Sequence, residues 1–123
     1  MVSPWMKYGS LLGFIRANPS ANRFSLCAQI ADGLAYMHQQ GIAHGDVKGD
    51  NVVVSDAGLA RITDFGCATM KRDFPVYFTI TESLNYSVRW AAPELFLEDG
   101  LSSFETDVYA LAMALFWSAL PVY

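Results

Sequence analysis

The chain has 123 residues, of which 53% are apolar and 16% are charged, and its formal net charge is −4. These values exclude intrinsic disorder as the main description and exclude a dominant basic face for nucleic-acid binding. The length suffices for one domain at most. A chain this short and this apolar either has a dense core or lacks something against which it packs.

Localisation is predicted from the cysteines and from the most apolar stretch. Cys27 and Cys67 are far apart and lie in no paired motif, which argues against a disulfide framework or a zinc site. The N-terminus has no secretory signal pattern. Residues 108–123 lack charge, but they fall short of the roughly 20 residues that span a bilayer and include Pro121. We expect a buried helix there, no membrane partner and a cytoplasmic location.

Two helices are predicted in the first third of the chain. Ser10 is a good N-cap for a short helix that ends at Asn18, because Pro19 disfavours the α region in the residue before it. A second helix is predicted between Ser20 and Gln40, with Gly41 as its left-handed C-terminal cap. Its expected buried stripe consists of Phe24, Cys27, Ile30, Ala31, Leu34 and Met37.

Two further residues of this helix carry expectations of their own. Gly33 lowers helix stability by about 1 kcal/mol relative to alanine, so we expect another backbone to approach it closely. His38, near the end of the helix, is interpreted as a surface residue.

The middle of the chain changes character. Residues 44–51 are polar and contain glycine, and the β-prone runs 52–54 and 59–63 flank a tight turn, which predicts a loop followed by a hairpin. Residues 64–91 show no period and are typical of a functional loop.

The last third is predicted to be helical. A short helix is expected over 92–97, with proline in its first turn. Ser102 and Glu105 form a predicted capping box that opens a final helix through Leu120. This helix is apolar on nearly every side, so we expect it to be buried.

A group of polar residues indicates a magnesium-dependent phosphotransfer site. Asp46, Lys48 and Asn51 share the polar loop, and Asp64 follows the hairpin. Two carboxylates and an amide are ligands of the type that Mg²⁺ takes, with phosphate oxygens and water completing its shell. A nearby lysine suits a migrating phosphoryl group, because phosphoryl transfer depends mainly on positioning and charge neutralisation.

The order and spacing of three motifs resemble those of the eukaryotic protein kinases. The motifs are His44-Gly-Asp-Val-Lys-Gly-Asp-Asn51, Asp64-Phe-Gly66 and Ala92-Pro-Glu94. The lysine two residues after Asp46 is similar to the serine/threonine pattern. Residues 86–94 resemble the tyrosine-kinase-like group of serine/threonine kinases.

The resemblance implies roles for the site residues. Asp46 would orient the substrate hydroxyl, Lys48 would steady the γ-phosphate of ATP, and Ser87 would contact both. Asn51 and Asp64 would be the Mg²⁺ ligands.

Further roles follow from the same resemblance. Ser3 would hold the gatekeeper place, Met6 would offer backbone groups to adenine, and Val53 would lie beneath the adenine ring. Asp107 would accept hydrogen bonds from the catalytic-loop backbone, and His44 would pack beneath Phe65.

The resemblance also implies an α+β fold: the mostly helical large lobe of a protein kinase with a short two-stranded β element. Residues 1–9 correspond to the interlobe hinge and residues 10–123 to part of the large lobe. The small lobe, with its phosphate-gripping lysine, and the last large-lobe helices would lie outside this sequence. We therefore expect an incomplete domain that binds MgATP poorly and folds marginally by itself.

One departure from the family pattern is Gly45, where the commonest catalytic loop has arginine. Because that arginine bridges to a phosphorylated activation loop, we hypothesise that loop phosphorylation is not the main switch here. The hydroxyl residues of the region are interpreted as plain loop residues: Thr69, Thr79, Thr81, Ser83 and Tyr86.

The predicted function is therefore ATP-dependent phosphoryl transfer to protein Ser/Thr hydroxyls. One alternative is a catalytically dead kinase-like decoy or binding module. Another is an aminoglycoside- or choline-type phosphotransferase, which shares the His-Gly-Asp pattern but generally lacks Lys48 and the later motifs.

Overall fold

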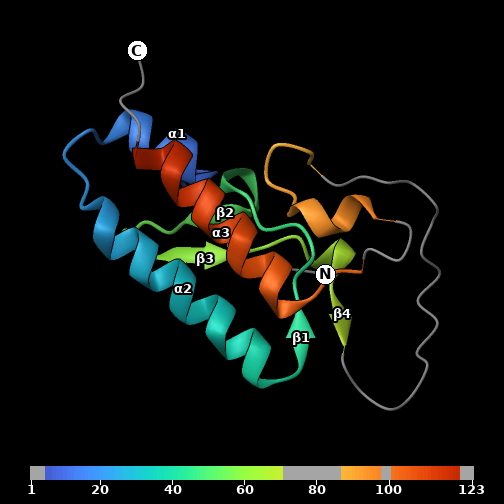
Figure 1. Ribbon diagram of the computed structural model, residues 1–123. Coiled ribbons are helices and arrows are strands. Elements are labelled where there is room, and N and C mark those ends of the chain that lie inside the picture. Colours follow the sequence, from blue (N-terminus) through green and yellow to red (C-terminus); the bar gives the residue numbers. More distant parts are fainter. Residues whose placement is uncertain (1–4, 71–86, 98–100, 120–123) are drawn as a thin grey trace.

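The computed structural model describes residues 5–70, 87–97 and 101–119, with side chains as far as Phe116 (Figure 1). Its helices are α1 (Leu11–Ala17), α2 (Arg23–Gln39) and α3 (Phe104–Ala119), with single 3₁₀ turns at Gly49–Asn51, Phe65–Cys67 and Pro93–Phe96. Its strands are β1 (Ile42–Ala43), β2 (Val52–Val54), β3 (Ala60–Ile62) and β4 (Thr69–Met70). The predicted fold class, mostly helical with a small β element, is confirmed.

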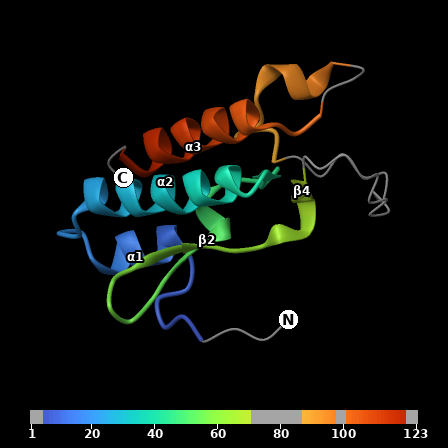
Figure 2. The ribbon, with the colours of Figure 1, turned by 90° about the horizontal axis from the view of Figure 1, so that it is seen from below.

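The helices lie in layers. Figure 2 shows α3 beside α2, running in the opposite direction, with α1 and the β2–β3 hairpin on the other side of α2. One buried cluster joins α1, α2 and the hairpin: Leu11, Phe14, Ile15, Leu26, Ile30, Val52, Val54 and Ala60. A second cluster of Leu34, Val47 and Ala110 joins α2, the polar loop and α3. The polar loop is therefore packed between the two long helices.

The first helix begins and ends as predicted. The Ser10 side chain accepts a hydrogen bond from the Gly13 backbone amide at the start of α1, and Asn18 forms its C-cap. An isolated bridge between Ser10 and Val53 joins this start to β2. The segment before α1 is thereby fixed beside the hairpin.

The second helix begins later than predicted, and two members of its expected stripe are wrong. Asn22 caps the helix through the Ser25 amide. Leu26 is buried together with Ile30, whereas Phe24 is 89% exposed and Ala31 is also exposed. The buried residues of α2 follow a line that begins at Leu26, which the predicted stripe did not contain. Gly41 has φ +75°, so the predicted left-handed cap is confirmed.

The hairpin between β2 and β3 is confirmed, with Val52 opposite Ile62. The predicted close approach of another backbone to Gly33 is wrong. A Cβ at Gly33 would instead meet the side chain of Ile62, at 3.5 Å. A second pairing, of β1 with β4, was not predicted. Each of these strands has only two residues, too few to show the alternation of apolar and polar residues by which a strand is recognised in a sequence.

The final helix differs from expectation at its start and on its outer face. The reciprocal capping bonds link Ser103 with Thr106, one residue later than the predicted pair of Ser102 and Glu105. Val108 and Phe116 are 56% and 59% exposed, so the helix is not buried on every side. Within the described part of the chain, no helix is long and apolar enough to cross a membrane.

Candidate active site

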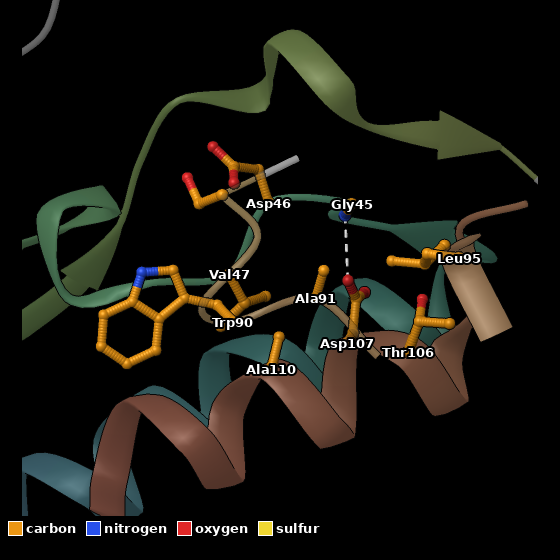
Figure 3. Close-up of a pocket in the computed structure, with 10 residues that line it drawn as sticks. Gly45, Asp46, Val47, Trp90, Ala91, Leu95, Thr106, Asp107 and Ala110 are labelled. Atoms are coloured by element: carbon orange, nitrogen blue, oxygen red, sulfur yellow. Dashed lines mark hydrogen bonds between the residues drawn. The ribbon is translucent and has the colours of Figure 1, made fainter. Parts of the chain in front are cut away.

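The polar loop is anchored by a buried carboxylate on α3. Asp107 is 2% exposed, and its two oxygens accept hydrogen bonds from the backbone amides of His44 (2.7 Å) and Gly45 (2.9 Å). Figure 3 shows this carboxylate rising from α3 to Gly45, while the Asp46 side chain points away from α3. The predicted role of Asp107 as a buried acceptor is confirmed. Burying a charge is costly unless donors surround it, so these bonds hold the loop to the helix.

Asp46 lies at the centre of a polar cluster. Its Oδ2 accepts hydrogen bonds from Lys48 Nζ (2.6 Å) and Asn51 Nδ2 (2.9 Å). Asn51 Nδ2 also donates to the Asp46 carbonyl at 2.8 Å. Lys48 Nζ reaches Ser87 Oγ at 2.9 Å, from a segment 39 residues away. The structure thus brings together four of the predicted site residues.

His44 joins this cluster to the segment that carries Asp64. The imidazole is 0% exposed; its Nδ1 accepts from the Asp46 amide (3.2 Å), and its Nε2 donates to the Thr63 carbonyl (3.0 Å). Because a carbonyl only accepts, the ring holds its hydrogen on Nε2. Its ring centroid is 5.5 Å from that of Phe65 at a tilted angle of 59°. The expected packing of His44 against Phe65 is present as a tilted contact.

Asp64 occupies an exposed turn with a left-handed backbone, at φ 62° and ψ 75°. The Thr63 amide donates to the Asn51 carbonyl at 2.9 Å, which extends the β2–β3 ladder by one residue pair. Asp64 therefore comes one residue after the backbone partner of Asn51. Its own side chain accepts only a long bond, 3.4 Å, from the Gly66 amide.

The Cys67 thiol is influenced by both carboxylates of the site. Partial burial raises the pKa of this thiol, the negative charges of Asp46 and Asp64 raise it further, and Lys48 lowers it. Both carboxylates thus lie within electrostatic range of one side chain. The segment that follows Asp64 also passes close to the loop, because a Cβ at Gly45 would lie 2.5 Å from the Cys67 carbonyl oxygen.

Gly45 occupies a position that no other residue type fits without a shift of the backbone. It has φ +81°, and a Cβ there would lie 2.5 Å from the Cys67 carbonyl oxygen. An arginine introduced here would displace the neighbouring loop as well as add a charge. Of the hydroxyl residues interpreted as plain loop residues, Thr69 is exposed in β4, and the other four lie outside the described residues.

The residues expected near adenine lie beside the hairpin. The Met6 carbonyl accepts from the Gly9 amide at 3.0 Å, and the Gly9 carbonyl accepts from the Val54 amide at 3.1 Å. These bonds hold the turn at Met6 next to the strand that carries Val53. Ser3 lies outside the described residues.

The donor set fits a magnesium ion in its chemistry. Both hydrogens of the Asn51 amide nitrogen are directed at Asp46, so its oxygen is the atom that is suited to a cation. The exposed Asp64 carboxylate supplies further oxygen. No cluster of three His, Cys, Asp or Glu side chains is found among the described residues, and such a site would depend on phosphate oxygens and water for its other ligands.

Two hollows lie near these residues, and neither is a complete nucleotide site. A cavity of about 20 Å³, room for one water molecule, lies between α3 and the side chains of Asp46 and Ser87 (Figure 3). A groove of about 990 Å³ between α2 and β3 is lined by Phe65 and Gly66 but by none of the four clustered residues.

His38, interpreted from the sequence as a surface residue, is largely buried in the structure. Its Nε2 lies 2.8 Å from Asp107 Oδ2, and its side chain is 16% exposed. Its ring also stacks on Phe104, with centroids 4.4 Å apart. The interpretation as a surface residue is wrong. The signal that was available is its spacing from Leu34, which places it beside the buried side of α2.

Comparisons with known proteins agree with this geometry. The family described as protein tyrosine and serine/threonine kinase matches residues 1–118. A relative named MAP3K epsilon protein kinase 1, from Brassica napus, is 30% identical over 116 residues; the match covers 90% of this chain and 9% of that protein. The chain thus spans about a tenth of the length of this relative. The family match over nearly all residues, together with the clustered Asp46, Lys48 and Asn51, shows that the chain belongs to the protein tyrosine and serine/threonine kinase family.

Proposed function

We propose that this chain carries the catalytic loop of a kinase that transfers the γ-phosphate of ATP to Ser or Thr hydroxyls of proteins. The observation that supports this most is the pair of hydrogen bonds that Lys48 and Asn51 donate to Oδ2 of Asp46. They fix a carboxylate, a cation and an amide within one contact network. Such fixed groups suit a reaction that depends on positioning and charge stabilisation.

Asp46 would act on the acceptor hydroxyl. Because its Oδ2 is occupied by two donors, Oδ1 is the atom that would accept the hydroxyl hydrogen and direct the oxygen at the phosphorus. Lys48 would place its positive charge next to the same oxygen and the transferred phosphoryl group. Ser87 would help to hold the Lys48 ammonium by accepting a second hydrogen bond from it.

Asn51 and Asp64 would hold Mg²⁺, the former through its amide oxygen and the latter through its carboxylate. When bound, this ion neutralises charge on the triphosphate. Met6 and Ser3 would border the adenine site from the hinge, and Val53 would line it from the hairpin. The contacts from Gly9 to Met6 and Val54 support this arrangement because they hold the hinge on the strand.

Specificity for Ser and Thr is the finer part of the proposal. The lysine two residues after Asp46 supports it, since its ammonium bridges Asp46 and Ser87 beside the carboxylate that would receive the hydroxyl. The phosphate-gripping lysine of the family is expected in the small lobe, so the 123-residue chain alone should have low activity and weak affinity for MgATP. Micromolar binding of MgATP by the isolated chain in calorimetry would contradict this last point. We place the reaction in the cytoplasm.

The experiment measures transfer of radiolabelled γ-phosphate by the longest natural protein that contains this chain. The substrates are peptides that differ only in Ser, Thr or Tyr as the acceptor. The Asp46→Asn variant should lose about 100-fold or more of turnover, the typical contribution of a positioned base. Asp56→Asn, in the exposed turn of the hairpin, is the matched control.

Three results would contradict the proposal. Full activity of Asp46→Asn would exclude the assigned base. Phosphorylation of the tyrosine peptide alone would exclude Ser/Thr specificity. An inactive wild type with intact folding would favour a kinase-like binding module.

A further inference from the structure

We propose that Gln29 of α2 is a positioning residue for the nucleotide, because it holds the outer edge of the hairpin that carries Val53. The inference deepens the proposed function, on which it rests for the place of Val53 beneath adenine. The Gln29 side chain reaches across from the helix to Ala60 at the start of β3, 31 residues further along the chain.

The outer edge of β3 has a buried backbone amide that β2 does not satisfy. The Thr63 amide faces β2, since it donates to the Asn51 carbonyl. Because amides alternate in direction along an antiparallel pair, the Ala60 amide faces away from β2. Ala60 is only 7% exposed, and a buried amide without an acceptor is costly. The acceptor is Gln29 Oε1, at 2.8 Å.

The opposite edge of the hairpin is held at the same residue pair. Val54 lies opposite Ala60, and its amide donates to the Gly9 carbonyl at 3.1 Å. The pair next to Val53 is therefore supported from both sides, by the hinge segment on β2 and by Gln29 on β3. A two-stranded hairpin is only marginally stable without such supports. Loss of the Gln29 bond should therefore loosen β3.

The carboxamide of Gln29 is fixed in one orientation. Since the Ala60 amide only donates, the atom that faces it is the side-chain oxygen. The nitrogen then donates to Ser25 Oγ, one helical turn earlier, at 3.2 Å. Position 29 thus has to present an acceptor to β3. Glutamate meets this requirement, whereas the thioether of methionine is only a weak acceptor.

The hairpin transmits this support to the proposed nucleotide site. Val53 is next to the supported pair in β2. At the other end of β3, the bond from Thr63 to Asn51 leads directly into the Asp64 turn. A shift of β3 would move the surface expected beneath adenine and the start of this turn. The effect of losing the Gln29 bond should therefore appear in the affinity for MgATP.

Three variants isolate the hydrogen bond, each made in the longest natural protein that contains this chain. Gln29→Met keeps the length and the helix propensity of the side chain and removes the strong acceptor. Gln29→Glu keeps an oxygen opposite Ala60, and the Ser25 hydroxyl is able to donate to its second oxygen. Gln39→Met makes the same change at an exposed position of the same helix and is the matched control.

The first measurement is the affinity for MgATP, determined by calorimetry. Gln29→Met should lower it by about two- to fivefold relative to the control, because a preorganised surface is lost. Gln29→Glu should restore it. A merely structural role would reduce the fraction of folded protein and leave the affinity of that fraction unchanged. Unchanged affinity in Gln29→Met, or an equal loss in Gln29→Glu, would overturn the proposal.

The second measurement is hydrogen exchange, read at single residues by mass spectrometry. In Gln29→Met the Ala60 amide should lose about fivefold of its protection, the change expected for one neutral hydrogen bond, while the His44 amide keeps its own. If Gln29→Met does not fold, the wild-type protein still tests the bond. Its Ala60 amide should exchange at least about tenfold more slowly than that of the exposed Asp56. Equal rates would overturn the proposal.

The outcomes also separate this inference from the function on which it rests. Transfer of phosphate with no effect of Gln29→Met on the affinity for MgATP would overturn the positioning role alone. The predicted loss of affinity in a protein that transfers no phosphate would overturn the proposed function and leave the positioning role in place. A wild type that binds no MgATP would overturn both.

Discussion

The catalytic loop and the Asp64 turn contribute to the same proposed site but are held very differently. In the loop, His44 and Asn51 are 0% and 6% exposed, and both bond to Asp46. In the turn, Asp64 and Phe65 are exposed, and the Asp64 side chain accepts a single bond of 3.4 Å. Local stability follows the number of buried contacts and protected hydrogen bonds. The loop is therefore organised before any ligand binds, whereas the order of the turn should increase when its carboxylate gains a cation.

Replacing Asp107 should have the largest effect on the loop. Asp107→Ala leaves two backbone amides and His38 without their acceptor, and removal of one side of a buried charged network costs roughly 3–5 kcal/mol of the free energy of unfolding. Urea denaturation of the longest natural protein that contains this chain measures this loss, because the 123 residues alone are expected to fold only marginally. Asp56→Ala, on the hairpin turn, should change it by less than about 0.5 kcal/mol. Equal effects of the two variants would show that the loop is not anchored through Asp107.

Gly45 and Gly58 form a matched pair for the next effect. Both have positive φ, but a Cβ at Gly45 meets the Cys67 carbonyl at 2.5 Å, and a Cβ at Gly58 meets nothing within 4 Å. Gly58→Ala should cost about 1–2 kcal/mol for the left-handed conformation alone. Gly45→Ala should cost about 2–4 kcal/mol, because overpacking adds to the same term. A smaller loss at Gly45 than at Gly58 in thermal unfolding would contradict the close packing of the two loops.

Replacing Asp64 should weaken metal binding without lowering the stability of the fold, in contrast to replacements in the catalytic loop. Asp64→Asn keeps a residue type that tolerates the left-handed region, so the free energy of unfolding should change by less than about 0.5 kcal/mol. Retention of Mn²⁺ in the presence of ATP should nevertheless fall, because a carboxylate ligand is lost. Equilibrium dialysis measures the retained ion. Unchanged retention would remove Asp64 from the proposed metal site.

The smallest expected effect concerns the reactivity of Cys67. Because burial and two carboxylates raise the pKa of this thiol, less thiolate is present at a given pH below that pKa than in an unperturbed cysteine. Asp64→Asn should lower the pKa and speed alkylation by iodoacetamide at pH 8 by roughly twofold. Lys48→Met removes a charge that lowers the pKa, so it should slow alkylation. Changes of the same sign in both variants would show that charge does not control the reaction.

Much of the fold could be predicted because its signals are local. Ser10, Gly41 and the two β-prone runs beside the tight turn each determine structure through their own backbone or nearest neighbours. The errors concern long-range contacts. The hydrogen-bond partner of His38 is Asp107, 69 residues away, and this pairing depends on how α3 packs against α2. Phe24 could not be recognised as exposed without knowing which side of α2 the hairpin covers.

The residues of the candidate site could be predicted from the sequence because the spacing of their motifs matches a family pattern. What the sequence could not supply is the contact of Lys48 with Ser87, since it depends on how the intervening 39 residues return to the loop. The unsuitability of position 45 for a side chain also required the backbone of Cys67.

Paramagnetic broadening by Mn²⁺ tests most directly whether the two regions form one ion site. Small amounts of Mn²⁺ with ATP are added to the nitrogen-15-labelled chain, and the NMR signals of its backbone amides are recorded. This method also detects weak binding. We predict that the Asn51 and Gly66 amides broaden together, ahead of those of the exposed turn at Asp56, and that Asp64→Asn reduces both effects. Broadening of only one of the two segments, or broadening no greater than at Asp56, would contradict a shared ion.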